Sequence, residues 1–177
     1  ACTETNTEHL RLLREASSAP EDAVFVESTE DAAAFLGKTE GNILLTTGSK
    51  ELSRYASIPD FSSRVWARVL PMQASLDACS KAGLSPSHVI AMQGPFSLEL
   101  NEAMLRAIGA DWLVTKDGGS TGGFPEKALA AQKTGARLLV IGRPAQEEGK
   151  TLSETIQTLC ARFGFSRTAD VTVVGIG

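Results

Sequence analysis

The chain has 177 residues, of which 42% are hydrophobic, so it can bury a core, and its length favours one main domain. A formal net charge of -4 argues against a general nucleic-acid binder. The first twenty residues are too charged for a signal peptide, and no apolar run is long enough for a membrane helix. We therefore expect a cytoplasmic protein that binds neither nucleic acid nor a membrane. Three widely separated cysteines and two isolated histidines predict no disulfide framework and no metal site.

Short apolar runs recur along the chain roughly every 25 residues, which is the length of one strand plus one crossover helix. In chain order, the predicted strands are Ala23–Val26, Asn42–Thr46, Arg64–Leu70, His88–Met92, Asp111–Thr115 and Arg137–Ile141. These runs lack strict polar alternation, and right-handed crossovers favour parallel strands. We therefore predict an α/β, Rossmann-like fold with a mainly parallel sheet and helices on both faces.

Helical periodicity lies between the strands. Ser28 begins one predicted helix with Asp31 at capping-box spacing, and Gly37 ends it. Ser97 is placed to cap a helix that Gly109 ends, and a further helix is predicted over residues 151–163. A last apolar run at residues 170–177 predicts another strand.

In an open α/β sheet, ligands bind beyond the carboxyl ends of the strands, so the loops that follow each strand are the candidate sites. The loop Thr46–Lys50 contains Gly48, which permits a tight turn, and its free amides and Lys50 suit a phosphate or carboxylate. An ordinary turn with Ser49 as a helix cap is an equal alternative.

The glycine-rich loop Lys116–Gly123 is the strongest candidate. Lys116 and Asp117 are ionisable groups at the end of a strand, where they could hold an anion or transfer a proton, and Pro125 suits the first turn of the next helix. The loop has neither the Walker nor the dinucleotide-binding glycine spacing. The alternative is a flexible connection with a solvated Lys–Asp pair.

Two further loops are expected at the same edge: Gln93–Phe96 and Gly142–Pro144. Arg143 could bind a carboxylate through two hydrogen bonds, or it could be an ordinary surface arginine. Arg68, near the end of its strand, could bind the ligand, or it could simply be a charge at the strand end.

Several of these segments, in the same order and at similar spacing, resemble the precorrin-6A reductase family. They are Leu44–Leu52, Arg68–Pro71, Gln93–Phe96, Leu113–Gly119 and Gly142–Pro144. The resemblance implies an oxidoreductase that uses NADPH to reduce one double bond of the tetrapyrrole precorrin-6A, or of its cobalt form, during corrin synthesis. It also implies two Rossmann-like domains that enclose cofactor and substrate.

The resemblance assigns this chain to the C-terminal domain. Residues 1–20 would be the end of a missing N-terminal domain or a linker, and residues 21–166 the reductase domain. Residues 167–177 would be a final strand or the start of a fused methyltransferase, because they are similar to the first strand of the corrin methyltransferases. The partners implied by the resemblance are the tetrapyrrole substrate, the missing N-terminal domain, and a corrin methyltransferase that is either fused to this chain or a separate neighbouring protein.

Together, loop position and resemblance predict three groups of site residues. Lys116 and Asp117 are the catalytic candidates. The cofactor-binding candidates are Thr47, Gly48, Ser49, Lys50, Gly118 and Gly119. The substrate-binding candidates are Arg68, Gln93, Gly94 and Arg143. The alternative function is a non-catalytic module that binds a nucleotide or a phosphate.

Overall fold

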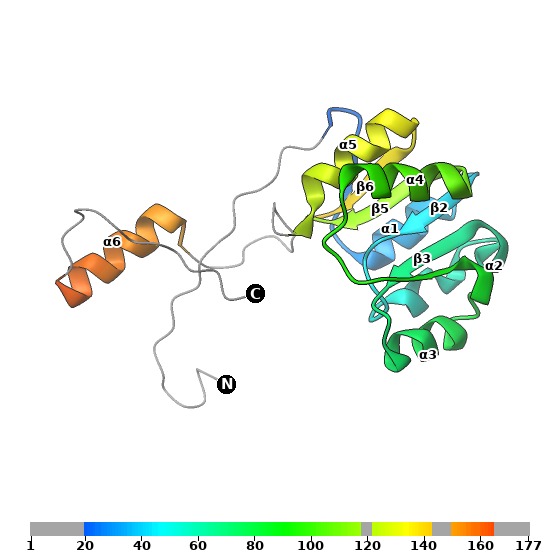
Figure 1. Cartoon of the computed structure of the whole chain (residues 1–177), viewed down its shortest axis with the longest axis horizontal. Helices are drawn as coiled ribbons and strands as arrows, with labels where there is room; N and C mark the ends of the chain where they lie inside the picture. Colours follow the sequence, from blue (N-terminus) through cyan, green and yellow to red (C-terminus); the bar gives the residue numbers. More distant parts are fainter. Residues whose placement is uncertain (1–19, 118–121, 143–149, 165–177) are drawn as a thin grey trace. The chain divides into compact units, whose positions relative to one another are not determined.

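The computed structural model describes residues 20–117, 122–142 and 150–164. The chain divides into two compact units, Ala16–Gln146 and a smaller one that combines Ala1–Glu15 with Glu147–Gly177. In the described part of the larger unit, strands and helices form a parallel sheet with helices on both faces, which confirms the predicted fold class (Figure 1). The strands are β1 (Val24–Val26), β2 (Asn42–Leu45), β3 (Val65–Val69), β4 (Val89–Ala91), β5 (Ala110–Lys116) and β6 (Arg137–Ile141).

The order of the strands creates a switch point at the centre of the sheet. The order is β1-β6-β5-β2-β3-β4, and every pair is parallel. From β2 the chain moves outward to β3 and β4, and it then returns to place β5 on the other side of β2. The loops after β2 and β5 therefore lead in opposite directions, and such a divergence is where open α/β sheets bind ligands.

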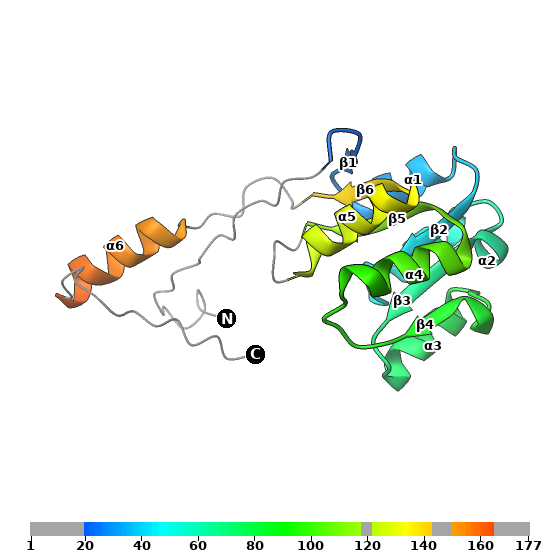
Figure 2. The ribbon, with the colours of Figure 1, turned by 45° about the horizontal axis from the view of Figure 1, so that its top comes forward.

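Neighbouring residues in the central strands pack into two different cores. In β2, Ile43 and Leu45 belong to one hydrophobic cluster, whereas Leu44 belongs to the other. The first cluster includes residues of α1 (Thr29–Leu36), η1 (Leu52–Ser57) and α3 (Gln73–Lys81). The second includes residues of α4 (Leu98–Ile108) and α5 (Phe124–Thr134), which lie side by side over the opposite face (Figure 2).

The predicted helix caps are present. The Ser28 hydroxyl accepts a hydrogen bond from the backbone N–H of Asp31, and the Ser97 hydroxyl accepts one from the backbone N–H of Leu100. Gly109 ends α4 in the left-handed conformation. In the smaller unit, α6 (Leu152–Phe163) begins at a capping box. The backbone N–H of Glu154 donates to the Thr151 hydroxyl, and the backbone N–H of Thr151 donates to the Glu154 carboxylate. None of the described helices is both long and apolar enough to span a membrane. The strand predicted at residues 170–177 lies outside the described residues.

The connection from β2 to β3 differs from the expected strand–helix alternation. It contains η1, a 3-10 helix, and α2 (Phe61–Arg64), a single helical turn. Pro59 disfavours the helical conformation at the residue before it, and Ile58 is accordingly extended, with φ -66° and ψ 129°. The proline therefore ends η1 before a regular α-helix can form.

The first residue of β2 makes polar contacts with β5 and with the last residue of α4. The Asn42 backbone N–H donates to Asp111 Oδ2 at 2.7 Å, and Asn42 Nδ2 donates to the Ile108 carbonyl at 2.8 Å. The preceding Gly41 has φ +85°, and a Cβ on it would overlap the Asp111 carboxylate. Glycine is therefore required here both by conformation and by the close approach of Asp111.

We expect Gly41→Ala to lower the free energy of unfolding by about 2–4 kcal/mol, since it combines left-handed strain with a steric clash. Gly83→Ala is the matched control, because Gly83 has φ +79° but open space around its Cα. It should cost only about 1–2 kcal/mol. Urea denaturation of both variants measures the difference, and equal losses would show that the Asp111 contact does not constrain this turn.

Candidate functional site

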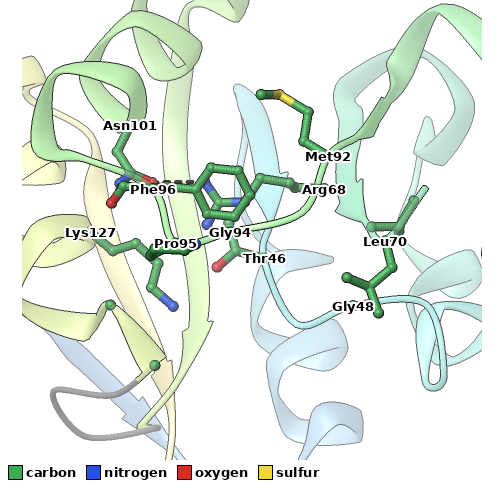
Figure 3. A pocket seen from close by; sticks show the side chains of 13 residues that line it. Thr46, Gly48, Arg68, Leu70, Met92, Gly94, Pro95, Phe96, Asn101 and Lys127 are labelled. Carbon is green, nitrogen blue, oxygen red and sulfur yellow. Dashed lines mark hydrogen bonds between the residues drawn. The ribbon is translucent and has the colours of Figure 1, made fainter. Parts of the chain in front are cut away.

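A cavity of about 540 Å³ opens at the carboxyl edge of the sheet, beside the switch point. Thr46 and Gly48 line it from the loop after β2, and the last residues of β3 and the loop after β4 form further walls. Helices α4 and α5 contribute Asn101 and Lys127. Figure 3 shows these side chains, which come from segments far apart in the sequence, around one space.

Arg68 is a charged residue within an otherwise apolar strand, and only 7% of its surface is exposed. Its Nη1 donates to Asn101 Oδ1 at 2.7 Å, and its guanidinium carbon lies 3.9 Å from the centroid of the Phe96 ring (Figure 3). A ring face attracts a cation at this distance. Burial lowers the pKa of Arg68 to about 10, so the side chain stays charged at neutral pH.

The loop after β4 is shaped to hold the Phe96 ring over Arg68. Asn101 Nδ2 donates to the carbonyls of Ser97 at 2.8 Å and Phe96 at 3.4 Å, which fixes both the amide and the loop. A Cβ on Gly94 would lie 2.9 Å from the Phe96 ring, so the ring occupies the space that any other side chain would need. This contact gives a physical reason for the glycine in the Gln93–Phe96 segment.

Lys127 is the second buried cation, and it too is 7% exposed. Its Nζ donates to Thr115 Oγ1 at 2.9 Å. The pKa of Lys127 is lowered to about 8, first by burial and then by the positive charge of Arg68, while Glu126 acts in the opposite direction. The ammonium group therefore remains largely protonated at neutral pH but loses its proton far more readily than an exposed lysine.

The cavity carries an excess of positive charge. Across the described residues, no carboxylate forms an ion pair with Arg68 or Lys127, whose partners are an amide, a thioether sulfur, a hydroxyl and an aromatic ring. Gly123, the N-cap residue of α5, also lines the cavity, and it provides no side-chain cap for the helix. The N-terminus of α5 therefore adds the positive end of the helix dipole. The arrangement is suited to binding an anion.

A second cavity, of about 340 Å³, lies at the same edge and has a different electrostatic character. Lys116 and Asp117 line it together with Glu51 and Arg54. Lys116 Nζ forms an ion pair with Glu51, and this hydrogen bond is the main reason that the pKa of Glu51 is lowered. Arg54 pairs with both Glu51 and Glu30. The cations of this cavity are therefore matched by carboxylates.

Some of the predicted site residues line the larger cavity, some line the smaller one, and others line neither. Gly48, Arg68 and Gly94 line the larger cavity, and Lys116 and Asp117 line the smaller one. Four predicted residues line neither cavity: Thr47, Ser49, Lys50 and Gln93. Instead, the Ser49 hydroxyl donates to the Ser75 hydroxyl at 3.1 Å. Gly118, Gly119 and Arg143 lie outside the described residues.

Sequence reasoning missed Lys127 and Asn101, although a signal was present for both. Lys127 lies on the buried stripe of α5, between Phe124 and Ala131 at helical spacing, and Asn101 lies on the buried face of α4. A polar residue on the core-facing stripe of a helix needs a partner or a function. The glycine-rich loop drew attention to Lys116 instead, which is exposed and paired.

Comparisons with known proteins agree with one another. Residues 1–160 match the model of the family described as "Precorrin-6x reductase CbiJ/CobK". The chain is 34% identical to the cobalt-precorrin-6A reductase of Priestia megaterium, over 90% of this chain and 65% of that protein. It is 35% identical to the protein of the same name from Methanothermobacter thermautotrophicus, over 90% of this chain and 53% of that one.

The fold is also found in a solved structure. A structure of the CobK precorrin-6A reductase aligns with a TM-score of 0.68 and 19% identity, over 95% of this chain and 67% of that chain. At this identity the likeness concerns the fold alone. The chain spans between about half and two thirds of the length of the two relatives named above.

The depressed pKa of Lys127 predicts a pH-dependent stability. Its pKa falls from 10.5 to about 8 on folding, so the unfolded chain holds this proton more tightly, and burial of the charge is destabilising below about pH 8. That penalty disappears as the pH rises from about 8 to 10.5. We expect Lys127→Met to raise the free energy of unfolding at about pH 7 by up to about 3 kcal/mol, and by much less near pH 10.

Denaturant unfolding at the two pH values measures this difference. The control is Lys133→Met on the same helix, where the lysine is half exposed and pairs with Glu102. It should change the free energy of unfolding by less than about 0.5 kcal/mol at either pH. A Lys127→Met chain that is less stable than the wild type at neutral pH would contradict the unfavourable burial of this charge.

Proposed function

Because the chain belongs to the precorrin-6x reductase CbiJ/CobK family, we propose that it supplies one part of an enzyme that reduces a double bond of precorrin-6A, or of its cobalt form, with NADPH. The match over residues 1–160 carries this proposal. The chain spans 65% and 53% of two relatives, so the activity is proposed for the complete reductase, meaning this chain together with the natural sequence that flanks it.

The larger cavity supports a tetrapyrrole as the substrate. Such a macrocycle has a flat apolar body and carboxylate arms, and it needs positive groups next to apolar surface. Arg68 and Lys127 supply the charge. Leu70 and Met92, which are 48% and 39% exposed, lie at the same cavity with Phe96 and offer apolar contact (Figure 3). We propose that the substrate lies against this edge of the sheet.

The donors around the larger cavity would fit the phosphates of NADPH as well as carboxylates, because both are oxyanions that accept hydrogen bonds from arginine, lysine and helix amides. NADPH would supply the hydride. For the loop Thr47–Lys50 and for Gly118 and Gly119 we retain the role predicted from sequence, contact with this cofactor. In support, the space around Gly48 is open, so a ligand can approach its backbone.

For Lys116 and Asp117 we propose the roles predicted from their position. Asp117, or a water held by it, would donate the proton, and Lys116 would hold an anionic group. Both line the smaller cavity at the carboxyl end of β5. Lys116 is paired with Glu51, so holding a ligand requires that it exchange this carboxylate for the ligand's.

The proposal is tested by mixing the complete reductase with cobalt-free or cobalt-containing precorrin-6A and following the absorbance of NADPH. We expect oxidation of NADPH in proportion to the substrate added, and none by this chain alone. Failure of the complete reductase to oxidise NADPH with either substrate would disprove the function. Tight binding of NADPH by this chain alone, without turnover in the complete protein, would favour the non-catalytic binding module.

The proposed acid is tested separately by Asp117→Asn in the complete reductase. We expect kcat to fall by about 10²-fold or more, because the loss of a positioned acid removes general acid catalysis, while KM for NADPH changes little. Asp77→Asn is the control, since Asp77 is an exposed residue of α3 that accepts from Gln73. An Asp117→Asn enzyme with unchanged kcat would remove Asp117 from the mechanism.

A further inference from the structure

We propose that Arg68 and Lys127 together form a buried seat for one oxyanion, a carboxylate or a phosphate, inside the larger cavity. Neither the family match nor the motifs found in the sequence identify Lys127 as a ligand-binding residue. The choice between the two kinds of oxyanion rests on the proposed function, whereas the seat itself rests on the geometry and charge of the described residues.

The two buried cations lack a paired counter-charge among the residues that the structure describes. Removing an ammonium or guanidinium group from water is unfavourable unless an opposite charge compensates for it. Here two such groups are each 93% buried, close enough for the charge of one to lower the pKa of the other, and neither has an ion-pair partner among the described residues. An anion between them would supply the missing charge.

Neutral groups hold both cations in place without neutralising them. Asn101, itself 3% exposed, accepts from Arg68 and is fixed by its own hydrogen bonds to the loop after β4. Thr115, fully buried, accepts from Lys127 and donates to the Lys116 carbonyl at 3.2 Å. Each cation thus keeps donor groups for a ligand, and its position is set before the ligand arrives.

The surroundings favour a carboxylate of a large apolar ligand. Phe96 covers the Arg68 guanidinium, and Leu70 and Met92 line the same cavity, so one wall is apolar and the seat is charged. A free inorganic anion would use only the seat. A tetrapyrrole would use both, with a carboxylate arm in the seat and its ring against the apolar wall.

Binding should be coupled to proton uptake by Lys127. The described charged groups that act on its ammonium are Arg68, from β3, which lowers its pKa, and Glu126, from its own helix, which raises it. Thr115 of β5 and Asn101 of α4 do not titrate. A bound anion would raise the pKa of Lys127 from about 8, so the affinity should decline as the pH rises through this value.

Isothermal titration of this chain with uroporphyrin, a stable tetrapyrrole with carboxylate arms, tests the seat at low ionic strength. We expect Lys127→Met and Arg68→Met each to weaken binding by about tenfold or more, because each removes a charged hydrogen bond. Arg68→Lys should restore part of the affinity. The controls are Lys133→Met and Arg106→Met, which remove exposed cations of α5 and α4 and should change the affinity less than about twofold.

The same titrations in two buffers of different ionisation enthalpy, near pH 8.5, give the number of protons taken up. The wild type should take up a fraction of one proton, and Lys127→Met none. A purely structural role for Lys127 would not produce this uptake. Thermal unfolding of the unliganded variants shows whether they are folded, and Lys127→Met should melt no lower than the wild type.

Parallel titrations with inorganic phosphate and NADPH identify the source of the oxyanion. If the substitutions weaken NADPH binding but not uroporphyrin binding, the seat is supported and its occupant is a phosphate. If Lys127→Met and Arg68→Met bind all probes as the control variants do, or the wild type binds none, the seat is disproved. Turnover by the complete reductase is a separate readout, so the proposed function can stand without the seat, and the seat without the function.

Discussion

The arrangement of the larger cavity depends on the burial of two positive charges, Arg68 and Lys127, with which no described carboxylate forms an ion pair. A protein interior accepts an uncompensated cation only where fixed neutral groups replace some of the lost water. Asn101, Thr115 and the Phe96 ring are such groups here. They reduce the electrostatic penalty but leave the positive field in place, and a ligand anion can then exploit that field.

The fold assembles these five residues by its topology. Because β5 returns to lie beside β2, the helix that follows β5 reaches the same edge of the sheet as the end of β3. Helices α4 and α5 pack against each other on one face, so Asn101 approaches Arg68 from one helix and Lys127 enters from the other. The switch point is therefore a condition for the cavity as well as its location.

The two cavities at this edge show two ways of treating charge. In the smaller one, Lys116, Glu51, Arg54 and Glu30 form ion pairs at the surface, where water and the partners both stabilise each charge. In the larger one, the cations are buried and have no ion-pair partner in the described part of the chain, which is unfavourable for stability. Residues of this second kind are typical of binding sites, because evolution accepts local destabilisation where a ligand restores the balance. The difference supports an anion-binding role for the larger cavity.

The sequence by itself determined the fold class, the order of strands and helices, and the helix ends at Ser28, Ser97 and Gly109, since each depends on local periodicity or on the capping chemistry of a few neighbouring residues. It also placed the candidate site at the carboxyl ends of the strands and included Arg68. It did not identify the role of Lys127, because a lysine on a core-facing helix stripe indicates a partner or a function, and which of the two applies depends on its neighbours in the fold.

Only the tertiary structure decided which residues share a cavity. Lys116 and Lys127 are close in sequence, yet one pairs with Glu51 in the smaller cavity and the other is buried beside Thr115, in the cavity that also contains Arg68. The physical reason is that burial and charge compensation depend on contacts between distant segments. The sequence fixes which groups are ionisable, but packing decides which of them lose water and which find a partner.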